Sequence, residues 1–190
     1  MRITKKTLKL LLLTAISGII MGFISKIFLD FLTLAGEFRD KHPYILIMLP
    51  VTGMLTSFVY KNYGEGSQGG NNLIIDSVHK NSHVPLRMSF FTFIFTVLTH
   101  LSGGSAGREG TAVQIGGTIT NKLAEAFRLD GIDKKILIMS GISAGFGSVF
   151  GTPLAGTFFG AEMCFMGKLS YESLVPCFTA SYIADFVAKS

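Results

Sequence analysis

The stretch Leu101–Gly117, LSGGSAGREGTAVQIGG, places a cation and an anion side by side among glycines, where a new apolar segment begins. Arg108 and Glu109 are its only formally charged residues, and Gly107 and Gly110 flank them. Ionisable side chains are costly in a membrane and usually mark a substrate or ion pathway there. Whether this pair has such a role depends on the solvent that the rest of the sequence predicts.

Composition predicts a membrane protein. The 190 residues are 48% hydrophobic and 15% charged, with a mean hydropathy of +0.49, whereas soluble domains carry about 25% charged residues. The net charge of +5 does not indicate a nucleic-acid partner, because the basic residues form no single face or run. They collect between apolar segments, as they do on cytoplasmic membrane loops.

The N-terminal segment allows two interpretations, a signal peptide or a first membrane helix. Arg2 and three lysines precede the apolar run Leu10–Leu34, which is longer than the roughly 7–15-residue core of a signal peptide. We therefore predict a membrane helix whose N-terminus is cytoplasmic, in a multi-pass protein of the cell membrane.

The later apolar segments are short or interrupted by glycine and proline, and we expect Leu129–Lys135 to be a charged loop. Broken helices leave backbone groups unpaired at membrane depth, which is tolerated where they line protein or a water-filled cavity. This pattern is typical of transporters. The segments are Tyr44–Tyr60, Met88–Leu101, Thr111–Phe127, Ile136–Gly167 and Ser173–Ala188.

The Arg108–Glu109 pair lies where the helix Thr111–Phe127 is expected to begin. A helix N-terminus offers unpaired N–H groups and the positive end of its dipole, so it can bind an anion. Gly107 and Gly110 allow close approach of the backbone. A carboxylate in the first turn would compete with that anion and leave on protonation. The alternative is that Glu109 is a helix-capping acid paired with Arg108.

A second helix start follows the glycines of GEGSQGGNNLIID, with Gly70 directly before Asn71 and Asn72. Asparagine caps helices and offers amide N–H donors to an anion. We predict a short helix over Leu73–Val78. The stretch also matches the dinucleotide pattern G-x-G-x-x-G, but no strand is evident before it and no acidic residue follows at the ribose-binding distance.

The remaining polar residues suggest no enzyme and no cofactor, since no nucleophile–base arrangement is visible. Glu162 is either a second proton station or an interfacial acid. The glycine pairs at Gly141 and Gly145, and at 156 and 160, favour helix packing. Cys164 and Cys177 are expected to be buried thiols rather than a disulfide or metal site. The tyrosines at 44, 60 and 63 fit interfacial anchoring.

Three segments, GREGTAVQIGG, FRLDG and SAGFGSVFGTPLAGTFFGAEM, together resemble the CLC family of chloride channels and proton-coupled anion transporters. The likeness runs from about Gly103 to Met163 and, more weakly, from Gly69. It implies that Glu109 is the gating glutamate of the family motif GREGP. It also implies that Asn71 stands for the serine of the anion motif GSGIP, and that Glu162 lies near the intracellular proton glutamate.

The chain departs from the family pattern in three respects. Thr111 replaces the proline of GREGP, and Asn71–Asn72 replaces a Ser-Gly pair. Both changes are similar to the fluoride-exporting branch, so the resemblance leaves chloride and fluoride open. The third departure is length, because the chain resembles only the first of the two halves of the family's inverted repeat.

The predicted fold is an all-α integral membrane protein of short, tilted and broken helices, with residues 1–190 as one transmembrane domain. The predicted function is halide transport by a CLC-type channel or anion/proton antiporter. Its partners would be a halide, protons and the bilayer, with a homodimer or a second half completing it. The rivals are a non-transporting membrane subunit, in which Glu109 is only a cap, and a soluble phosphate-binding enzyme. The proposed site comprises Gly70, Asn71, Asn72, Gly107, Arg108 and Gly110 for the anion, and Glu109 and Glu162 for gating and proton coupling.

Overall fold

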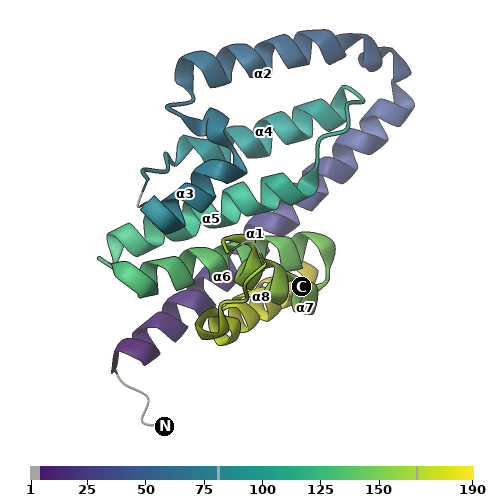
Figure 1. Cartoon of the computed structure of the whole chain (residues 1–190). Helices are drawn as coiled ribbons and strands as arrows, with labels where there is room; N and C mark the ends of the chain where they lie inside the picture. Colours follow the sequence, from purple (N-terminus) through teal and green to yellow (C-terminus); the bar gives the residue numbers. More distant parts are fainter. Residues whose placement is uncertain (1–4, 81, 166) are drawn as a thin grey trace.

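The computed structural model describes residues 5–80, 82–165 and 167–190, and no strand occurs in these ranges. Short 3-10 turns cover Pro43–Met48, Ser67–Gly69 and Tyr171–Ser173. The α-helices, shown in Figure 1, are α1 (Lys5–Lys41), α2 (Leu49–Tyr63), α3 (Asn71–Lys80), α4 (Arg87–Leu101), α5 (Arg108–Ala126), α6 (Gly131–Phe150), α7 (Pro153–Met163) and α8 (Leu174–Lys189).

Helix length divides the described elements into two kinds. α1 has 37 residues, and it extends the predicted run Leu10–Leu34 at both ends. α1 and the segment Pro43–Tyr63 are long and apolar enough to cross a membrane. α3 and α7 have only 10 and 11 residues, shorter than the roughly 20 that a full span requires. The predicted mixture of long and short helices is therefore present.

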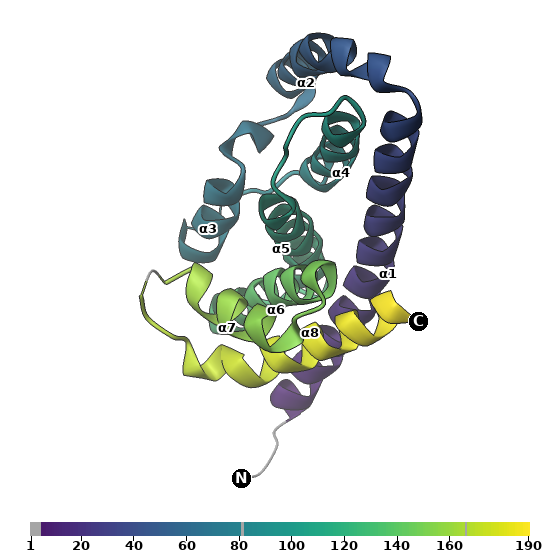
Figure 2. The ribbon, with the colours of Figure 1, turned by 90° about the vertical axis from the view of Figure 1, so that its right-hand side faces the viewer.

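α1 runs along the whole molecule, and α8 crosses it near the C-terminus of the chain (Figure 2). The crossing is close because glycines face the backbone of α8. A Cβ atom placed on Gly18 would lie 2.7 Å from the carbonyl oxygen of Ala180, and one on Gly22 would lie 2.7 Å from that of Ala184. No larger residue fits either position unless the two helices separate.

α5, α6 and α7 pack by the same principle. A Cβ atom on Gly116 would collide with the carbonyl oxygen of Gly141, and one on Gly156 would lie 2.7 Å from the backbone nitrogen of Gly147. The packing role predicted for the glycines of this region is confirmed. Cys164 and Cys177 are buried and free, also as predicted.

The connections on either side of α6 correct one prediction and confirm another. The predicted loop Leu129–Lys135 is wrong beyond Asp130, because α6 already begins at Gly131. Asp130 has extended backbone angles at the N-cap and Asp133 lies in the first turn, where acidic side chains are favoured by the helix dipole. The segment Ile136–Gly167 is interrupted by glycine and proline as predicted, because Gly151 ends α6 with a φ of 65° and Pro153 opens α7.

α2 lies on the outside of the molecule, at the top of Figure 1, and none of its residues is buried. Hydrogen bonds link it to the rest of the chain. Thr52 bonds to Ser102 across 2.7 Å, and the Tyr60 hydroxyl lies 3.1 Å from the Thr92 hydroxyl of α4. A space lined by polar groups lies beneath α2.

Candidate functional site

The starts of α3 and α5 touch one another. A Cβ atom placed on Gly110 would lie 3.6 Å from Nδ2 of Asn71. Further along the same contact, Gly117 leaves room for Ile74, because a Cβ atom there would lie 2.5 Å from Cγ2 of Ile74. Ile74 is fully buried, so it anchors α3 against α5. The two helix starts that the sequence singled out are thus brought together.

Backbone geometry at these starts suits an approach of the main chain to a ligand. Gly70, with φ 54° and ψ −135°, turns the chain into α3, a conformation that L-residues with side chains rarely adopt. Gly107 is the extended N-cap residue of α5, and α5 begins at Arg108. No side chain caps α5, so its first N–H groups remain available to a ligand.

The amide of Asn71 is held by a second amide. Nε2 of Gln114 donates to Oδ1 of Asn71 across 3.1 Å, and Oε1 of Gln114 accepts from the Thr92 hydroxyl across 2.8 Å. Nδ2 of Asn71 makes no hydrogen bond within the described part of the chain. It therefore remains a donor beside the start of α5.

Glu109 lies in the first turn of α5, as predicted, and its side chain is exposed. Among the described residues it forms no salt bridge with Arg108 or any other cation. The Arg108 guanidinium instead lies over the ring of Phe150, 5.7 Å from its centroid. Asn72 is exposed next to Asn71. The carboxylate is thus free to move relative to the helix start.

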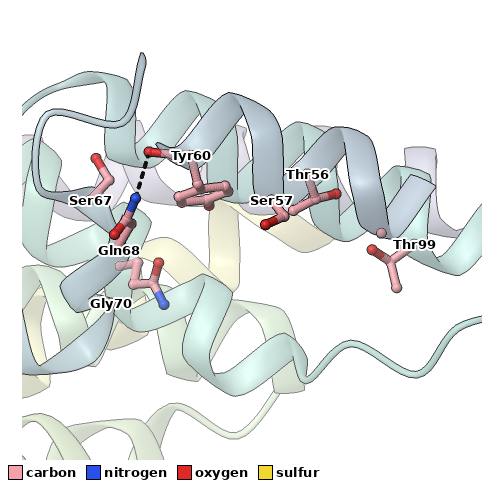
Figure 3. Close-up of a pocket in the computed structure, with 9 residues that line it drawn as sticks. Thr56, Ser57, Tyr60, Ser67, Gln68, Gly70 and Thr99 are labelled. Carbon is pink, nitrogen blue, oxygen red and sulfur yellow. Dashed lines mark hydrogen bonds between the residues drawn. The ribbon is translucent and has the colours of Figure 1, made fainter. Parts of the chain in front are cut away.

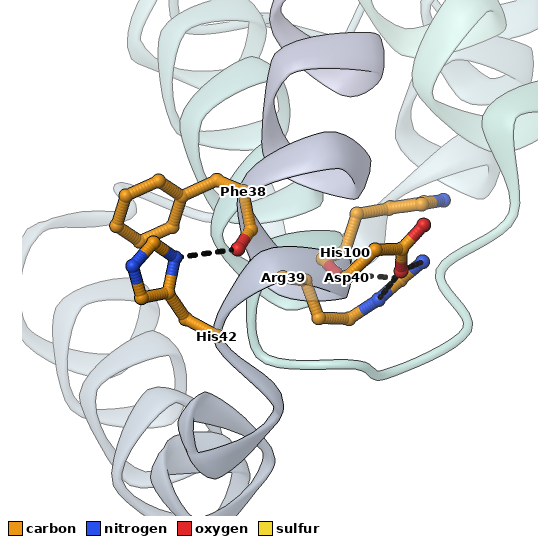
Figure 4. Close-up of polar contacts among 5 residues, drawn as sticks. All are labelled: Phe38, Arg39, Asp40, His42 and His100. Atoms are coloured by element: carbon orange, nitrogen blue, oxygen red, sulfur yellow. Dashed lines mark hydrogen bonds and ion pairs between the residues drawn. The ribbon is translucent and has the colours of Figure 1, made fainter.

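A basic cavity of about 330 Å³ lies on the α1 side of Arg108, where Arg39 and His100 also line it. Arg39 donates to Oδ1 of Asp40 across 3.0 Å and to the carbonyl oxygen of His100 across 3.2 Å (Figure 4). Asp40 therefore offsets the charge of Arg39. Arg108 has no carboxylate partner in the described ranges and supplies the uncompensated positive charge.

A second cavity, of about 510 Å³, lies under α2 and is walled by hydroxyl groups from α2 and α4 (Figure 3). It adjoins a cavity of about 330 Å³ that reaches Gly107 and Gly110. Tyr60 and Gln114 line both cavities, and neither lining includes a charged side chain. Hydroxyl and amide donors can replace the water around an anion. The hydroxyl-bearing side chains that line the larger cavity are Thr56, Ser57, Tyr60, Ser67 and Thr99.

Sequence reasoning missed three residues of this region. Tyr60 turns its hydroxyl to Thr92 and packs its ring against Phe95, contacts that the expected role as an interfacial anchor did not include. Thr92 and Gln114 had been given no role. Gln114 carried a usable signal, because it is an uncharged polar residue in an apolar helix one turn after Gly110.

Glu162 is not brought to this site. It is exposed in the last turn of α7. Two residues further on, the carbonyl oxygen of Cys164 contacts the ring of His79 near the end of α3. His79 lies eight residues after Asn71, about 12 Å along the helix axis at ~1.5 Å per residue. Glu162 therefore lies towards the far end of α3 from Asn71.

The family model described as voltage gated chloride channel matches residues 52–190. The chain belongs to the voltage-gated chloride channel family. A "Chloride/fluoride channel protein" of Pseudomonas syringae pv. tomato is 44% identical over 183 residues, which are 96% of this chain and 40% of the relative. An uncharacterized protein of Methanocaldococcus jannaschii is 26% identical over 188 residues, 96% of this chain and 44% of the relative.

Solved structures of this family share the fold. A CLC-type fluoride/proton antiporter matches with a TM-score of 0.91 and 37% identity over 98% of this chain and 48% of that one. A slow cyanobacterial Cl⁻/H⁺ antiporter matches with a TM-score of 0.70 and 23% identity, over 94% of this chain and 46% of that one. That likeness shows the fold alone. The predicted helical half of a CLC-type protein is confirmed. The chain spans about half the length of the family members it matches.

Proposed function

We propose that the chain supplies one half of a halide pathway in a CLC-type anion/proton antiporter, with fluoride as the preferred ion. The contact between Asn71 and the start of α5 carries the proposal, because it brings two helix N-termini to one place. Membership of the family and the 44% identical relative named a chloride/fluoride channel protein support it.

The anion would bind where α3 and α5 begin. The backbone N–H groups that follow Gly70 and Gly107 carry the positive ends of two helix dipoles. Nδ2 of Asn71 adds a side-chain donor between them. Arg108 lies over Phe150 and has no carboxylate partner among the described residues. Its positive charge would therefore attract anions to this end of α5. Most of these donors are polar but uncharged. They can replace the water around a small ion without binding the ion too tightly to release it.

Glu109 would gate this site and carry the proton. When ionised, its carboxylate occupies the position that the helix dipole favours for a negative charge. When protonated it is neutral, loses that attraction and swings away, and a halide takes its place. Because the Glu109 carboxylate and the halide alternate at one position, halide movement is coupled to a proton that moves in the opposite direction. Glu162, at the far end of α3, would act as a separate proton station.

The orientation and assembly of the chain follow from the same proposal. Arg2 and the lysines at the start of α1 favour a cytoplasmic N-terminus, and residues 1–190 would form one domain of the cell membrane. Because the chain spans about half of its relatives, a second half, or a second copy of the chain, would complete the pathway. The exposed apolar side chains of α2 and α8 are available for such contacts.

The rival function is a membrane subunit that transports nothing, in which the glycine crossings serve only assembly. Liposomes that contain the 190-residue chain separate the two. Fluoride and chloride electrodes record efflux from the chain and from Glu109→Ala, with Glu172→Ala on the Tyr171–Ser173 turn as the matched control. Efflux that changes with Glu109→Ala alone supports the proposal. Efflux that Glu109→Ala leaves unchanged contradicts the proposal, and absence of efflux from a chain shown to be folded and inserted excludes a pathway completed by a second copy of the chain.

A further inference from the structure

Polar side chains from four helices form one continuous hydrogen-bonded series that ends at Asn71. The hydroxyl of Tyr60 on α2 lies 3.1 Å from that of Thr92 on α4. Thr92 donates to Gln114 on α5 across 2.8 Å, and Gln114 donates to Asn71 on α3 across 3.1 Å. We name these four residues the amide relay.

The direction of each bond in the amide relay follows from the orientation of the Gln114 amide, with Oε1 towards Thr92 and Nε2 towards Asn71. A threonine hydroxyl has one proton to donate. Because Thr92 gives its proton to Oε1 of Gln114, the phenol of Tyr60 must donate to Oγ1 of Thr92. Because Nε2 of Gln114 donates to it, Asn71 must accept through Oδ1, and its two N–H donors are left over.

We propose that Thr92 and Gln114 are positioning residues, which occupy Oδ1 of Asn71 and so keep its N–H donors available beside the start of α5. The inference rests on the proposed function, in which Asn71 binds the halide. An unrestrained asparagine presents either its nitrogen or its oxygen, and the oxygen repels an anion. Fixing the amide in advance removes the reorganisation that binding would otherwise require.

Burial makes this restraint effective. Thr92 is only 6% exposed, and its hydroxyl is the donor that Oε1 of Gln114 has among the described residues. Loss of the hydroxyl leaves Oε1 of Gln114 and the phenol of Tyr60 without their partner. The Gln114 amide is then free to rotate, and the restraint on Asn71 is lost with it.

The variants isolate this effect from packing. Thr92→Val keeps the shape of the side chain and removes the hydroxyl, whereas Thr92→Ser restores the hydroxyl. Thr96→Val is the matched control, because Thr96 lies one turn further along α4 and is 7% exposed. The Thr96 hydroxyl bonds to Thr111 across 2.8 Å and does not reach the amide relay. Gln114→Glu is unsuitable because it adds a negative charge beside the anion.

The first measurement needs no anion. Side-chain amide signals of Gln114 and Asn71 are recorded by NMR for the ¹⁵N-labelled chain in nanodiscs. Thr92→Val is expected to shift both signals, although Thr92 is linked to Asn71 only through Gln114 in the hydrogen-bonded series. Thr96→Val and Thr92→Ser are expected to leave the Asn71 signal near its wild-type position. An Asn71 signal that does not respond to Thr92→Val overturns the inference.

The second measurement adds sodium fluoride to the same samples. The Asn71 amide signal is expected to move with fluoride, and Thr92→Val to weaken the apparent affinity by roughly two- to tenfold, the range of one net hydrogen bond. An unchanged affinity in Thr92→Val overturns the inference and leaves the proposed function intact. No fluoride response at Asn71 in the wild type contradicts the proposed anion site, and the inference fails with it.

Discussion

Gly110 and Asn71 lie close enough that a single methyl group on Gly110 would touch the Asn71 amide, 3.6 Å from Nδ2 and 3.7 Å from Oδ1. These two residues belong to different helices, α5 and α3. The space between them is bounded by the first turns of both helices and by Gln114. It is the position at which the proposal places the halide.

Gly110→Ala should therefore block anion movement without unfolding the protein. The added methyl group makes ordinary van der Waals contacts, so we expect a stability change within about 0.5 kcal/mol. Fluoride efflux should fall several-fold or more, in keeping with the ~1–3 kcal/mol that one methyl group is worth in a binding pocket. Gly53→Ala on α2, where a Cβ atom meets nothing within 4 Å, is the control. Normal efflux from Gly110→Ala would argue against this position for the halide.

Gly116→Ala, in contrast, should lower the stability of the protein. A Cβ atom there would collide with the backbone of Gly141, so α5 and α6 must separate. Overpacking of this kind destabilises by about 1–3 kcal/mol. Thermal unfolding in detergent should show a lower midpoint than for the wild type or Gly53→Ala. An unchanged midpoint would mean that the two helices do not pack as closely as described.

Ser25 of α1 and Ser148 of α6 share a buried hydrogen bond of 2.7 Å. Hydrogen bonds between membrane helices contribute about 0.6 kcal/mol on average. A double-mutant cycle with Ser25→Ala and Ser148→Ala should give a coupling free energy of that order when unfolding is measured. Purely additive effects would show that this bond does not stabilise the α1–α6 contact.

Glu162→Gln tests whether this acid handles protons apart from the anion site. Because Glu162 lies towards the far end of α3 from Asn71, the change should slow proton movement without altering fluoride affinity. Proton uptake and fluoride binding are measured on the same preparation, with Glu172→Gln as a control on another exposed acid. If proton uptake is unaffected, Glu162 is the interfacial acid that the sequence equally allowed.

Local signals in the sequence were sufficient for much of the fold. The Gly151 and Pro153 break follows from the conformational limits of glycine and proline, whereas α5 begins at Arg108, three residues before the predicted Thr111. The start of α6 was misplaced because Lys134 and Lys135 suggested a solvated loop. The structure instead places them in the first turns of the helix after Asp130.

The site was only half predictable for a physical reason. The residue types at Asn71 and Glu109 indicate anion chemistry by themselves. The bond from Gln114 to Asn71 joins residues 43 positions apart, and it depends on how α3 rests against α5. No local pattern encodes that packing, so the amide relay emerges only from the fold. The contact of Tyr60 with Thr92 was missed for the same reason, because Thr92 lies on another helix.

The central claim is that Glu109 competes with a halide at the start of α5 and carries the coupled proton. Fluoride and proton fluxes recorded together from liposomes, for the chain and for Glu109→Gln, test it most directly. The account predicts opposed fluoride and proton movement in the wild type, and fluoride movement without protons in Glu109→Gln. Unchanged proton movement in the variant would contradict it.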